Sequence, residues 1–311
     1  MILNSQSNLG VFSTLNICEC DMNLKATALI IILILTMGNI LNSNIAETPS
    51  AVDEDKDTDI LKTEKLSFRD VFKEEYKCDI NPNIPAKRYD DGKFVHDGYK
   101  LAYEDDDYTS RLGVDVSSFQ GDVNYDKVKA DGYDFVIIRC GYRGYGQAGN
   151  LKKDKYFEKN FENARKAGLD VGVYIYSQAV NETEAKEEAQ FVLDILNGRK
   201  LELPIVYDPE SVLDDVARTD DVTPEQFTLN AQTFVKTIKE AGYDVMIYSN
   251  MLWEAFELNL EKLQGVPVWY ADYESTPQTC YDFAFWQYTN TGHVSGIDGE
   301  TDINIQMLKK D

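Results

Sequence analysis

The feature that most constrains the fold is an alternation of apolar, strand-like runs with amphipathic helical segments, which begins near Leu112. The runs are apolar throughout, as is typical of parallel strands that are covered on both faces. The helical segments begin with capping residues, such as Asn181 with Glu184 and Thr223 before Pro224. The strand-like runs lie at 111–119, 134–142, 170–177, 203–210, 244–250, 266–273, 283–289 and 301–305.

About eight strand candidates in about 200 residues predict an α/β fold, namely an irregular, TIM-like β/α barrel over residues 112–311. The last three runs leave almost no room for helices between them, so we expect the barrel to be irregular there. A doubly wound open sheet is the alternative. No G-x-G-x-x-G follows the first run, and the GYRGYG segment at 141–146 lacks the Lys-Ser/Thr of a phosphate-binding loop.

The composition argues against several classes of protein. The formal net charge of the 311 residues is −23, and phosphate binding needs clusters of Lys and Arg, so nucleic acid is not an expected partner. Only two histidines occur, His96 and His293, and the five cysteines lack the spacing of a metal site. A zinc site or a Ser-His-Asp triad is therefore poorly supported. We expect neither a cofactor nor a metal.

Residues 1–46 are predicted to hold an N-terminal extension followed by a signal peptide or anchor. From Met22 the chain has the layout of a secretory signal, with an early lysine, a short apolar run and then small polar residues up to Ala46. Met22 is therefore the expected start of the protein. An uncleaved membrane anchor over residues 26–41 is the alternative, although its apolar core is shorter than a comfortable membrane span. Either way, we expect an extracellular or envelope-associated protein.

Residues 47–111 are predicted to form an acidic, mostly irregular linker. The segment contains the acidic runs VDEDKDTD and YEDDDY, which are typical of solvated spacers, and many turn-forming residues. A short helix is expected within it at 65–79. The linker would tether the barrel to the membrane or the cell wall.

The candidate site lies at the C-terminal ends of the strands, where β/α barrels place their active sites. The run LPIVYDPE ends in Asp208 and Glu210. Their i, i+2 spacing puts both side chains on one face of a strand, about 6–7 Å apart at the backbone. Pro209 removes a donor from the ladder and so ends the strand. The other polar residues at strand ends include Asp115, Asp272, Trp286, Gln287, Asp302 and Asn304.

Two neighbouring carboxylates repel when both ionise, which raises the pKa of one of them. Such a pair suits glycosidic cleavage. In this reaction a protonated acid donates its proton to the leaving oxygen, and an ionised partner stabilises the developing positive charge or acts as the nucleophile. A turn would explain Pro209 but not two acids on one face. A site for Mg²⁺ or Ca²⁺ is a further alternative for clustered acids.

Aromatic and amide side chains near the strand ends are expected to bind sugar rings and hydroxyl groups. Aromatic residues also favour strands for structural reasons, so several must belong to the core. Period 2 places Trp269 opposite Tyr270 and Asp272, so that these cannot all line one pocket. The predicted substrate-binding residues are Tyr176, Tyr248, Tyr270, Asp272, Trp286 and Gln287.

A set of motifs in this order resembles glycoside hydrolase family 25, the lysozymes (N-acetylmuramidases) of the Chalaropsis type. Each motif alone is weak, but the set is specific and covers residues 112 to 311. The motifs are GVDVSSFQG, GVYIYS, IVYDPE, MIYSN, VWYADY, FWQYTNTGHVSGIDG and TDIN.

The resemblance implies an enzyme that hydrolyses the β-1,4 bond between N-acetylmuramic acid and N-acetylglucosamine in peptidoglycan, with the glycan strands as its partner. The family's paired acids fall on Asp208 and Glu210, with Glu210 as general acid, and its other two acids fall on Asp115 and Asp302. Asp208 is then either the nucleophile or the support for an attack by the substrate's N-acetyl group. Pro209 departs from the residue usual in the family. A non-catalytic wall-binding barrel and another glycosidase, such as a chitinase, are the alternatives.

Overall fold

A computed structural model describes residues 64–212 and 215–311 of the chain. These residues belong to one unit that spans Leu61–Asp311. The predicted extension, the signal or anchor and the first part of the linker lie outside the described residues, so the predictions made for them stay predictions. Within the described ranges, no helix combines the length and apolar character that crossing a membrane requires.

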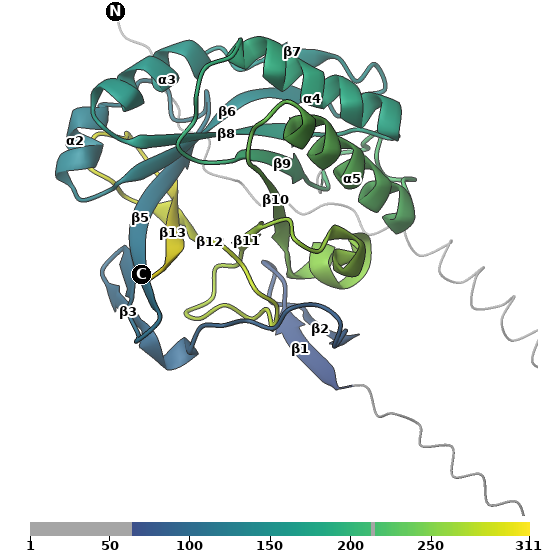
Figure 1. Cartoon of the computed structure of the whole chain (residues 1–311), viewed down its shortest axis with the longest axis horizontal. Coiled ribbons are helices and arrows are strands. Elements are labelled where there is room, and N and C mark those ends of the chain that lie inside the picture. Colours follow the sequence, from purple (N-terminus) through teal and green to yellow (C-terminus); the bar gives the residue numbers. More distant parts are fainter. Residues whose placement is uncertain (1–63, 213–214) are drawn as a thin grey trace, which may run out of the picture. The chain divides into compact units, whose positions relative to one another are not determined.

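Eight strands pair edge to edge and close into a mixed barrel. Figure 1 labels these strands. Neighbouring strands are parallel from β5 through β6, β8, β9, β10 and β11 to β12. The last strand, β13, is antiparallel to both β12 and β5 and completes the closure. The strands are β5 (Tyr108–Val116), β6 (Phe135–Arg143), β8 (Asp170–Ser177), β9 (Ile205–Pro209), β10 (Val245–Asn250), β11 (Val268–Ala271), β12 (Phe285–Gly292) and β13 (Thr301–Lys309).

The closed barrel confirms the predicted α/β barrel and excludes the doubly wound open sheet. The reversed direction of β13 matters for the site, because it brings the start of β13 to the same end of the barrel as the C-terminal ends of the other strands. A short additional strand, β7 (Leu151–Lys153), pairs with β6 outside this closure.

Helices cover the outer face of the barrel between residues 125 and 240 (Figure 1). Asn181 accepts a hydrogen bond from the Glu184 amide, and Thr223 accepts one from the Gln226 amide, so both predicted N-caps are confirmed. After β10 only a π-helical turn (Trp253–Glu257, η2) and a 3-10 turn (Leu260–Leu263, η3) follow. The helices are α2 (Tyr125–Ala130), α3 (Phe157–Lys166), α4 (Glu182–Leu196) and α5 (Pro224–Glu240).

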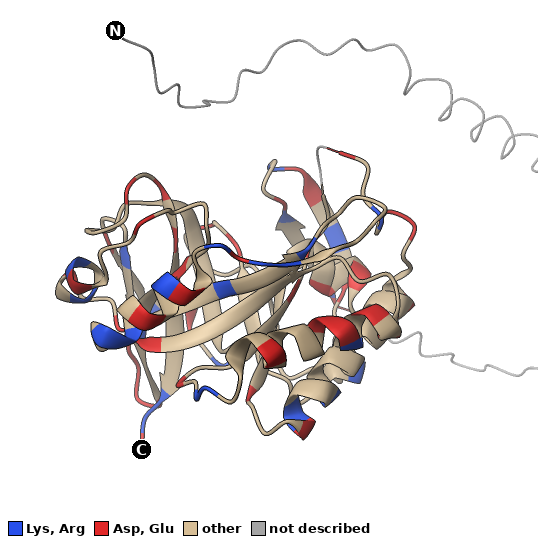
Figure 2. Ribbon diagram, turned by 90° about the horizontal axis from the view of Figure 1, so that it is seen from above, with Lys and Arg blue, Asp and Glu red and all other residues tan. Residues whose placement is uncertain are grey.

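The strands separate two apolar cores because their side chains alternate between the two faces. The inner core fills the barrel and includes Phe135, Val206, Met246 and Phe285. The outer core lies between the strands and the elements that cover them. Lys, Arg, Asp and Glu residues are interspersed along the helices and loops on the outside, as Figure 2 shows.

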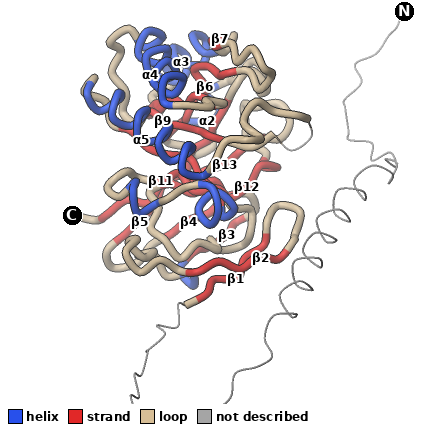
Figure 3. Tube along the Cα trace, turned by 90° about the vertical axis from the view of Figure 1, so that its right-hand side faces the viewer, coloured by secondary structure: helices blue, strands red, loops and turns tan. Residues whose placement is uncertain are grey.

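The prediction of a mostly irregular linker is wrong for residues 64–111. The segment expected to be a short helix is an antiparallel hairpin of β1 (Lys65–Arg69) and β2 (Glu75–Asp79). A second hairpin follows a 3-10 turn (Asp91–Lys93, η1) and consists of β3 (Phe94–Asp97) and β4 (Lys100–Tyr103). Both hairpins lie on the side of the barrel away from α3 and α4 (Figures 1 and 3).

The physical reason is that β11 and β12 lack covering helices. Their outward side chains Tyr270 and Trp286 are fully buried all the same. Phe94 packs edge-on against Trp286 with ring centroids 5.2 Å apart, and Tyr89 packs on Phe283 at 5.0 Å. Burying one large apolar side chain stabilises a fold by about 1.5–3 kcal/mol. The segment before β5 thus takes the place of the missing helices.

Candidate active site

Strand β9 positions the paired acids. Val206 belongs to the inner core and Tyr207 to the outer core, so Asp208 again faces inward. Strand β9 ends at Pro209, as predicted. Asp208 is 5% exposed, and Glu210, just beyond the strand, is half-buried. The change from Val206 to Asp208 marks the level at which the barrel interior turns from apolar to polar.

The backbone at Glu210 is held from the side. The Gln178 side-chain amide donates to the Glu210 carbonyl oxygen at 2.6 Å. The Thr219 hydroxyl in turn donates to the Gln178 side-chain oxygen at 3.0 Å. Gln178 and Thr219 are both buried, so the Glu210 backbone is held in place although the strand has ended.

The first and last strands bring two more acids to the same place. Asp115 on β5 and Asp302 on β13 are direct partners across the antiparallel ladder. Residues so paired have Cα atoms about 4.5–5.5 Å apart. Asp115 is 5% exposed and Asp302 is half-buried. The predicted acids Asp115, Asp208, Glu210 and Asp302 are therefore brought together at the barrel mouth.

Two amides hold Asp115. The Gln287 side chain donates to Asp115 Oδ2 at 2.9 Å, and the Asn304 side chain donates to the same oxygen at 2.8 Å. These two donors favour the ionised form of the Asp115 carboxyl.

The orientation of both amides is set by their other partners. The hydroxyl groups of Tyr248 and Tyr273 donate to Gln287 Oε1 at 3.0 and 2.9 Å. The Trp269 indole, which can only donate, bonds Asn304 Oδ1 at 2.8 Å. Both amide oxygens are thereby engaged, so the NH₂ groups of Gln287 and Asn304 face Asp115.

Burial raises the pKa of all four acids, and their mutual repulsion adds to this for three of them. The pKa of Asp115 rises only to about 6, because its two amide donors oppose the effect of burial. Burial and the Asp115 charge raise the pKa of Glu210 to about 7. Burial, with the charges of Asp115 and Glu210, raises the pKa of Asp302 to about 9. Asp115 is therefore the acid that ionises first.

Asp208 is the most strongly perturbed member of the cluster. Burial, and then the charges of Glu210 and Asp115, raise its pKa well above the usual value. Its Oδ1 atom has no hydrogen-bond partner among the described residues, so little offsets the loss of hydration. A cation opposes this effect, because the charge of Arg139 lowers the pKa of Asp208.

Arg139 was not predicted from the sequence. It lies on β6, where it donates from Nε to Asp154 Oδ2 at 2.9 Å and from a terminal nitrogen to Ser118 Oγ at 3.1 Å. Asp154 is fully buried, so the guanidinium is firmly placed. The signal that could have revealed Arg139 is period 2, because it follows the inner-core residues Phe135 and Ile137 on the same face.

The predicted substrate-binding residues divide between the two faces of the barrel wall. Tyr176, Tyr248 and Gln287 face inward at the mouth, and Tyr176 is the ladder partner of Asp208. The prediction is wrong for Tyr270 and Trp286, which belong to the outer core and are fully buried. The inward residues that sequence reasoning missed on β11 and just beyond it are Trp269 and Tyr273.

Asp272 has a structural role at the edge of the mouth. Its carboxylate accepts hydrogen bonds from the Tyr270 hydroxyl at 2.8 Å and from the Gln278 amide at 2.8 Å, and its carbonyl oxygen accepts one from the Trp286 indole at 2.8 Å. These bonds leave Asp272 only 8% exposed. Asp272 therefore shapes the loop after β11 and does not present a free carboxylate to a substrate.

A groove leads away from Glu210. Its volume is about 630 Å³, and the residues that line it include Glu210, Tyr248 and Tyr273. The turn of the β1–β2 hairpin, residues 70–74, lines it as well. Part of the segment predicted to be a linker is thus a wall of the candidate active site.

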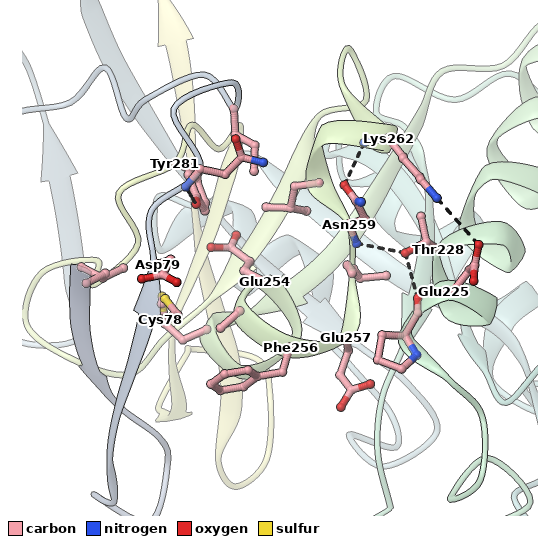
Figure 4. Close-up of a pocket in the computed structure, with 18 residues that line it drawn as sticks. Cys78, Asp79, Glu225, Thr228, Glu254, Phe256, Glu257, Asn259, Lys262 and Tyr281 are labelled. Atoms are coloured by element: carbon pink, nitrogen blue, oxygen red, sulfur yellow. Dashed lines mark hydrogen bonds and ion pairs between the residues drawn. The ribbon is translucent and has the colours of Figure 1, made fainter. Parts of the chain in front are cut away.

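A second cavity of about 560 Å³ lies behind this hairpin, and none of the four acids lines it (Figure 4). Glu254 of η2 lies across from Cys78 and Asp79 of β2 there. Burial raises the pKa of Glu254 to about 7, and the Thr279 hydroxyl donates to it at 2.6 Å. Across residues 64–212 and 215–311, His, Cys, Asp and Glu side chains form no group of three or more suited to a metal ion.

Comparison with known proteins decides the family. The model of glycosyl hydrolases family 25 matches residues 114–297, which is more than half of the chain. The chain belongs to glycosyl hydrolase family 25. The resemblance inferred from the sequence motifs is therefore confirmed, and the β1–β2 and β3–β4 hairpins both precede the matched region.

Two relatives show how far the similarity extends. The "Autolytic lysozyme" of Clostridium acetobutylicum is 27% identical over 193 residues, which is 62% of this chain and 54% of that protein. "Lysozyme M1" of Streptomyces globisporus is 26% identical over 207 residues, which is 62% of this chain and 66% of that protein. The chain thus spans between about half and two thirds of the length of these relatives.

Solved structures share the fold. The modular autolysin LytC from Streptococcus pneumoniae, in complex with a synthetic peptidoglycan ligand, is 25% identical with a TM-score of 0.56, over 77% of this chain and 56% of that chain. The lysozyme from Streptomyces coelicolor is 25% identical with a TM-score of 0.51, over 62% of this chain and 90% of that chain. The mixed eight-stranded barrel is the architecture of family 25 structures.

Proposed function

We propose that the barrel is a lysozyme that cleaves the β-1,4 bond between N-acetylmuramic acid and N-acetylglucosamine in peptidoglycan. The observation that carries the proposal is the cluster of four acids, in which two amides donate to Asp115 and favour its ionised form, while burial raises the pKa of Glu210 to about 7. Family membership and the names of the relatives, which include an autolytic lysozyme, support the same substrate.

In this proposal Glu210 is the general acid. Near neutral pH a large share of Glu210 is protonated, so it can donate its proton to the glycosidic oxygen as the bond to the leaving sugar breaks. Glu210 then takes a proton from the water that completes hydrolysis. The ionised Asp115 stabilises the positive charge that develops at the sugar ring.

Asp208 has two possible roles, and both begin from its place beside Glu210. In one, its carboxylate attacks the anomeric carbon and forms a covalent glycosyl intermediate that water hydrolyses. In the other, the acetamido oxygen of the substrate makes this attack and Asp208 orients the acetamido group. A thiazoline analogue of the cyclic intermediate distinguishes them, because tight competitive inhibition is expected only for the second route.

Tyr176, Tyr248 and Gln287 are the proposed contacts for the substrate, since they face the mouth beside the acids. Aromatic faces can pack on sugar rings, and the amide and hydroxyl groups can bond to sugar hydroxyls. A non-catalytic wall-binding barrel would require the aromatic residues but would have no use for a proton donor at Glu210.

The test is Glu210→Gln, with Glu240→Gln on the exposed surface of α5 as the matched control. Loss of a general acid should lower the rate of peptidoglycan hydrolysis by about 100-fold or more. The release of new reducing ends measures the rate, and circular dichroism checks the fold. The control should retain the rate of the parent protein. A Glu210→Gln protein of near-parental rate contradicts the proposal.

Product analysis separates the alternatives. Mass spectrometry of defined muropeptides should find N-acetylmuramic acid at the new reducing end. Binding of peptidoglycan without new reducing ends would instead indicate a wall-binding barrel, and cleavage of chitin in preference to peptidoglycan would indicate a chitinase.

We also propose that the protein acts outside the cell or on its envelope, with residues 26–41 as signal or anchor. The location of the proposed substrate supports this. Cell fractionation and N-terminal sequencing of the mature protein test it, and a protein recovered only from the cytoplasm contradicts it.

A further inference from the structure

We propose that the β1–β2 hairpin forms a glycan-binding subsite that extends the active-site groove, with Val71 and Phe72 as its contact residues. The inference rests on the proposed function, because the ligand is the glycan strand that Glu210 would cleave. The hairpin lies before residues 114–297, which the family model matches. The subsite would therefore lie outside the part of the chain that the family model matches.

The first argument is continuity. The groove of about 630 Å³ is lined both by Glu210 and by Val71 and Phe72 of the hairpin turn. A strand with its scissile bond at Glu210 would therefore continue along the groove past the hairpin turn. Tyr248 and Tyr273 line the same groove.

The second argument is that the hairpin is fixed to the barrel and so is preorganised. The Arg69 amide donates to Gln278 Oε1 at 2.8 Å, and Gln278 Nε2 donates to the Arg69 carbonyl oxygen at 2.9 Å. Gln278 is itself held by Asp272, and Lys73 forms an ion pair with Glu274 on the same loop. The loop after β11 therefore sets the position of the hairpin relative to the acids.

A third argument comes from which hairpin residues are buried. Phe68 and Tyr76 stack at 5.5 Å, and both lie near Phe256 of η2, at 6.3 and 6.2 Å. In contrast, two residues of the turn are exposed to solvent, since Val71 is 60% exposed and Phe72 is 68% exposed. The packing of Phe68 and Tyr76 fixes the hairpin and leaves two apolar side chains in solvent at the groove.

The turn holds the backbone of these two residues in place. Asp70 Oδ1 accepts hydrogen bonds from the Phe72 amide at 2.8 Å and from the Glu74 amide at 2.9 Å. Lys73 adopts a positive φ of 67°, which is uncommon for a residue with a side chain. A turn built in this way gives Val71 and Phe72 a defined position, which lowers the entropy that binding would cost.

The chemistry of the groove fits a neutral saccharide. Both cations of the hairpin turn region are paired, Arg69 with Glu75 and Lys73 with Glu274. An anionic polymer such as a phosphate chain would find these charges already neutralised. The apolar faces of sugar rings can pack on Phe72 and Val71, while the Asn250 amide in the groove can bond to hydroxyl groups.

The test measures binding in the full chain carrying Glu210→Gln, which removes turnover. Calorimetry compares peptidoglycan oligosaccharides of increasing length on three proteins: this parent, the parent with Val71→Ala and Phe72→Ala, and the parent with Val95→Ala and Tyr99→Ala. The last pair is the matched control, because Val95 and Tyr99 are exposed by 62% and 47% on the other hairpin and do not line the groove.

The parent and the control should bind long oligosaccharides more tightly than short ones. The Val71→Ala/Phe72→Ala protein should lose this gain, with about tenfold weaker binding of long strands and unchanged binding of the shortest ligand, as expected when one stacking contact is lost. Thermal unfolding verifies that all three proteins are folded.

Equal affinity of the parent and the Val71→Ala/Phe72→Ala protein for long strands overturns the subsite. So does an equal weakening at every length, which would place the effect at the acids. Failure of the proposed function is a separate result, because it would appear as a wild-type chain that releases no reducing ends. A length-dependent loss of binding in the hairpin variant would support the subsite even then.

Discussion

The inward and outward faces of β11 and β12 show how one pair of strands serves two purposes. The inward residues Trp269 and Gln287 belong to the hydrogen-bond network around Asp115. Their neighbours Tyr270 and Trp286 point the other way, where Tyr270 stacks on Phe283 and Trp286 packs against Phe94. The residue types are alike on both faces, so an aromatic residue in such a strand indicates a binding role only once its direction is known.

The cover of the outer face also differs around the barrel. Where helices cover the strands, several outward residues are aliphatic, such as Ile138, Val173 and Ile205, and Tyr207 of β9 packs on Phe234 of α5. Where the hairpins cover the strands, the outward residues are aromatic and meet aromatic partners, as Trp286 meets Phe94. The residues before β5 bury outward aromatic side chains of the barrel and are therefore part of the fold.

The largest effect is expected from removing that cover. A chain that starts at Leu112 lacks Phe94 over Trp286 and Tyr89 over Phe283, and it also loses the pairing of Tyr108 to Arg111 with β13. We expect it to show no cooperative thermal unfolding, whereas a chain that starts at Glu64 should unfold like the full-length protein. Circular dichroism during heating measures both. Cooperative unfolding of the chain that starts at Leu112 would show that the barrel folds without the hairpins, and it would contradict this prediction.

The next effect contrasts the two tryptophans. Trp286→Ala should lower the free energy of unfolding by about 3–5 kcal/mol, as for a large buried aromatic side chain. The kcat/KM of the molecules that remain folded should stay close to the parent value, because Trp286 does not face the mouth. Denaturant unfolding and peptidoglycan hydrolysis measure the two quantities. A selective loss of kcat/KM at unchanged stability would assign Trp286 to the site after all.

A smaller effect, on pH dependence, is expected for the inward neighbour of Trp286. Gln287→Leu removes one donor to Asp115, so the Asp115 pKa should rise further above about 6. Asp115 must be ionised to act, so the acidic limb of the kcat/KM profile should move to higher pH, by about one unit for one hydrogen bond to a charged group. The alkaline limb reflects deprotonation of Glu210 near pH 7.

Trp286→Phe is the outward control for this profile, and its acidic limb should not move. If Gln287→Leu leaves the acidic limb in place as well, then Asp115 is not the group whose ionisation the profile reports.

The smallest effect concerns stability at the acid cluster. An aspartate in an unfolded chain ionises near pH 3.9, whereas the pKa of Asp208 in the folded chain is raised well above this value. The folded state therefore binds more protons above that pH, and its stability falls as the pH rises. Asp208→Asn should raise the Tm by about a few degrees at pH 8, with a smaller gain towards pH 4.

Asp244→Asn, at an exposed position, is the control for this measurement and should leave the Tm nearly unchanged at both pH values. A lower Tm for Asp208→Asn at pH 8 would contradict the view that the cluster is held at a cost to stability.

Several features of this protein follow from the sequence alone. The apolar runs and capped helices predicted a β/α barrel, and the spacing of Asp208 and Glu210 predicted two acids on one face. Both inferences are local, because period and spacing depend on residues close together in the chain. The positions of Asp115 and Asp302 at strand ends were predicted in the same way.

Only the tertiary structure decided which face of β11 and β12 is inward, that β13 is antiparallel to its neighbours β12 and β5, and that the segment before β5 covers part of the barrel. These features depend on contacts between residues far apart in the chain, such as Asp115 with Gln287 and Phe94 with Trp286. Period 2 separates Trp269 from Tyr270 but is the same whichever of them faces the interior. Which of the two residues faces inward is set when the barrel closes and the segment before β5 packs on its outer face.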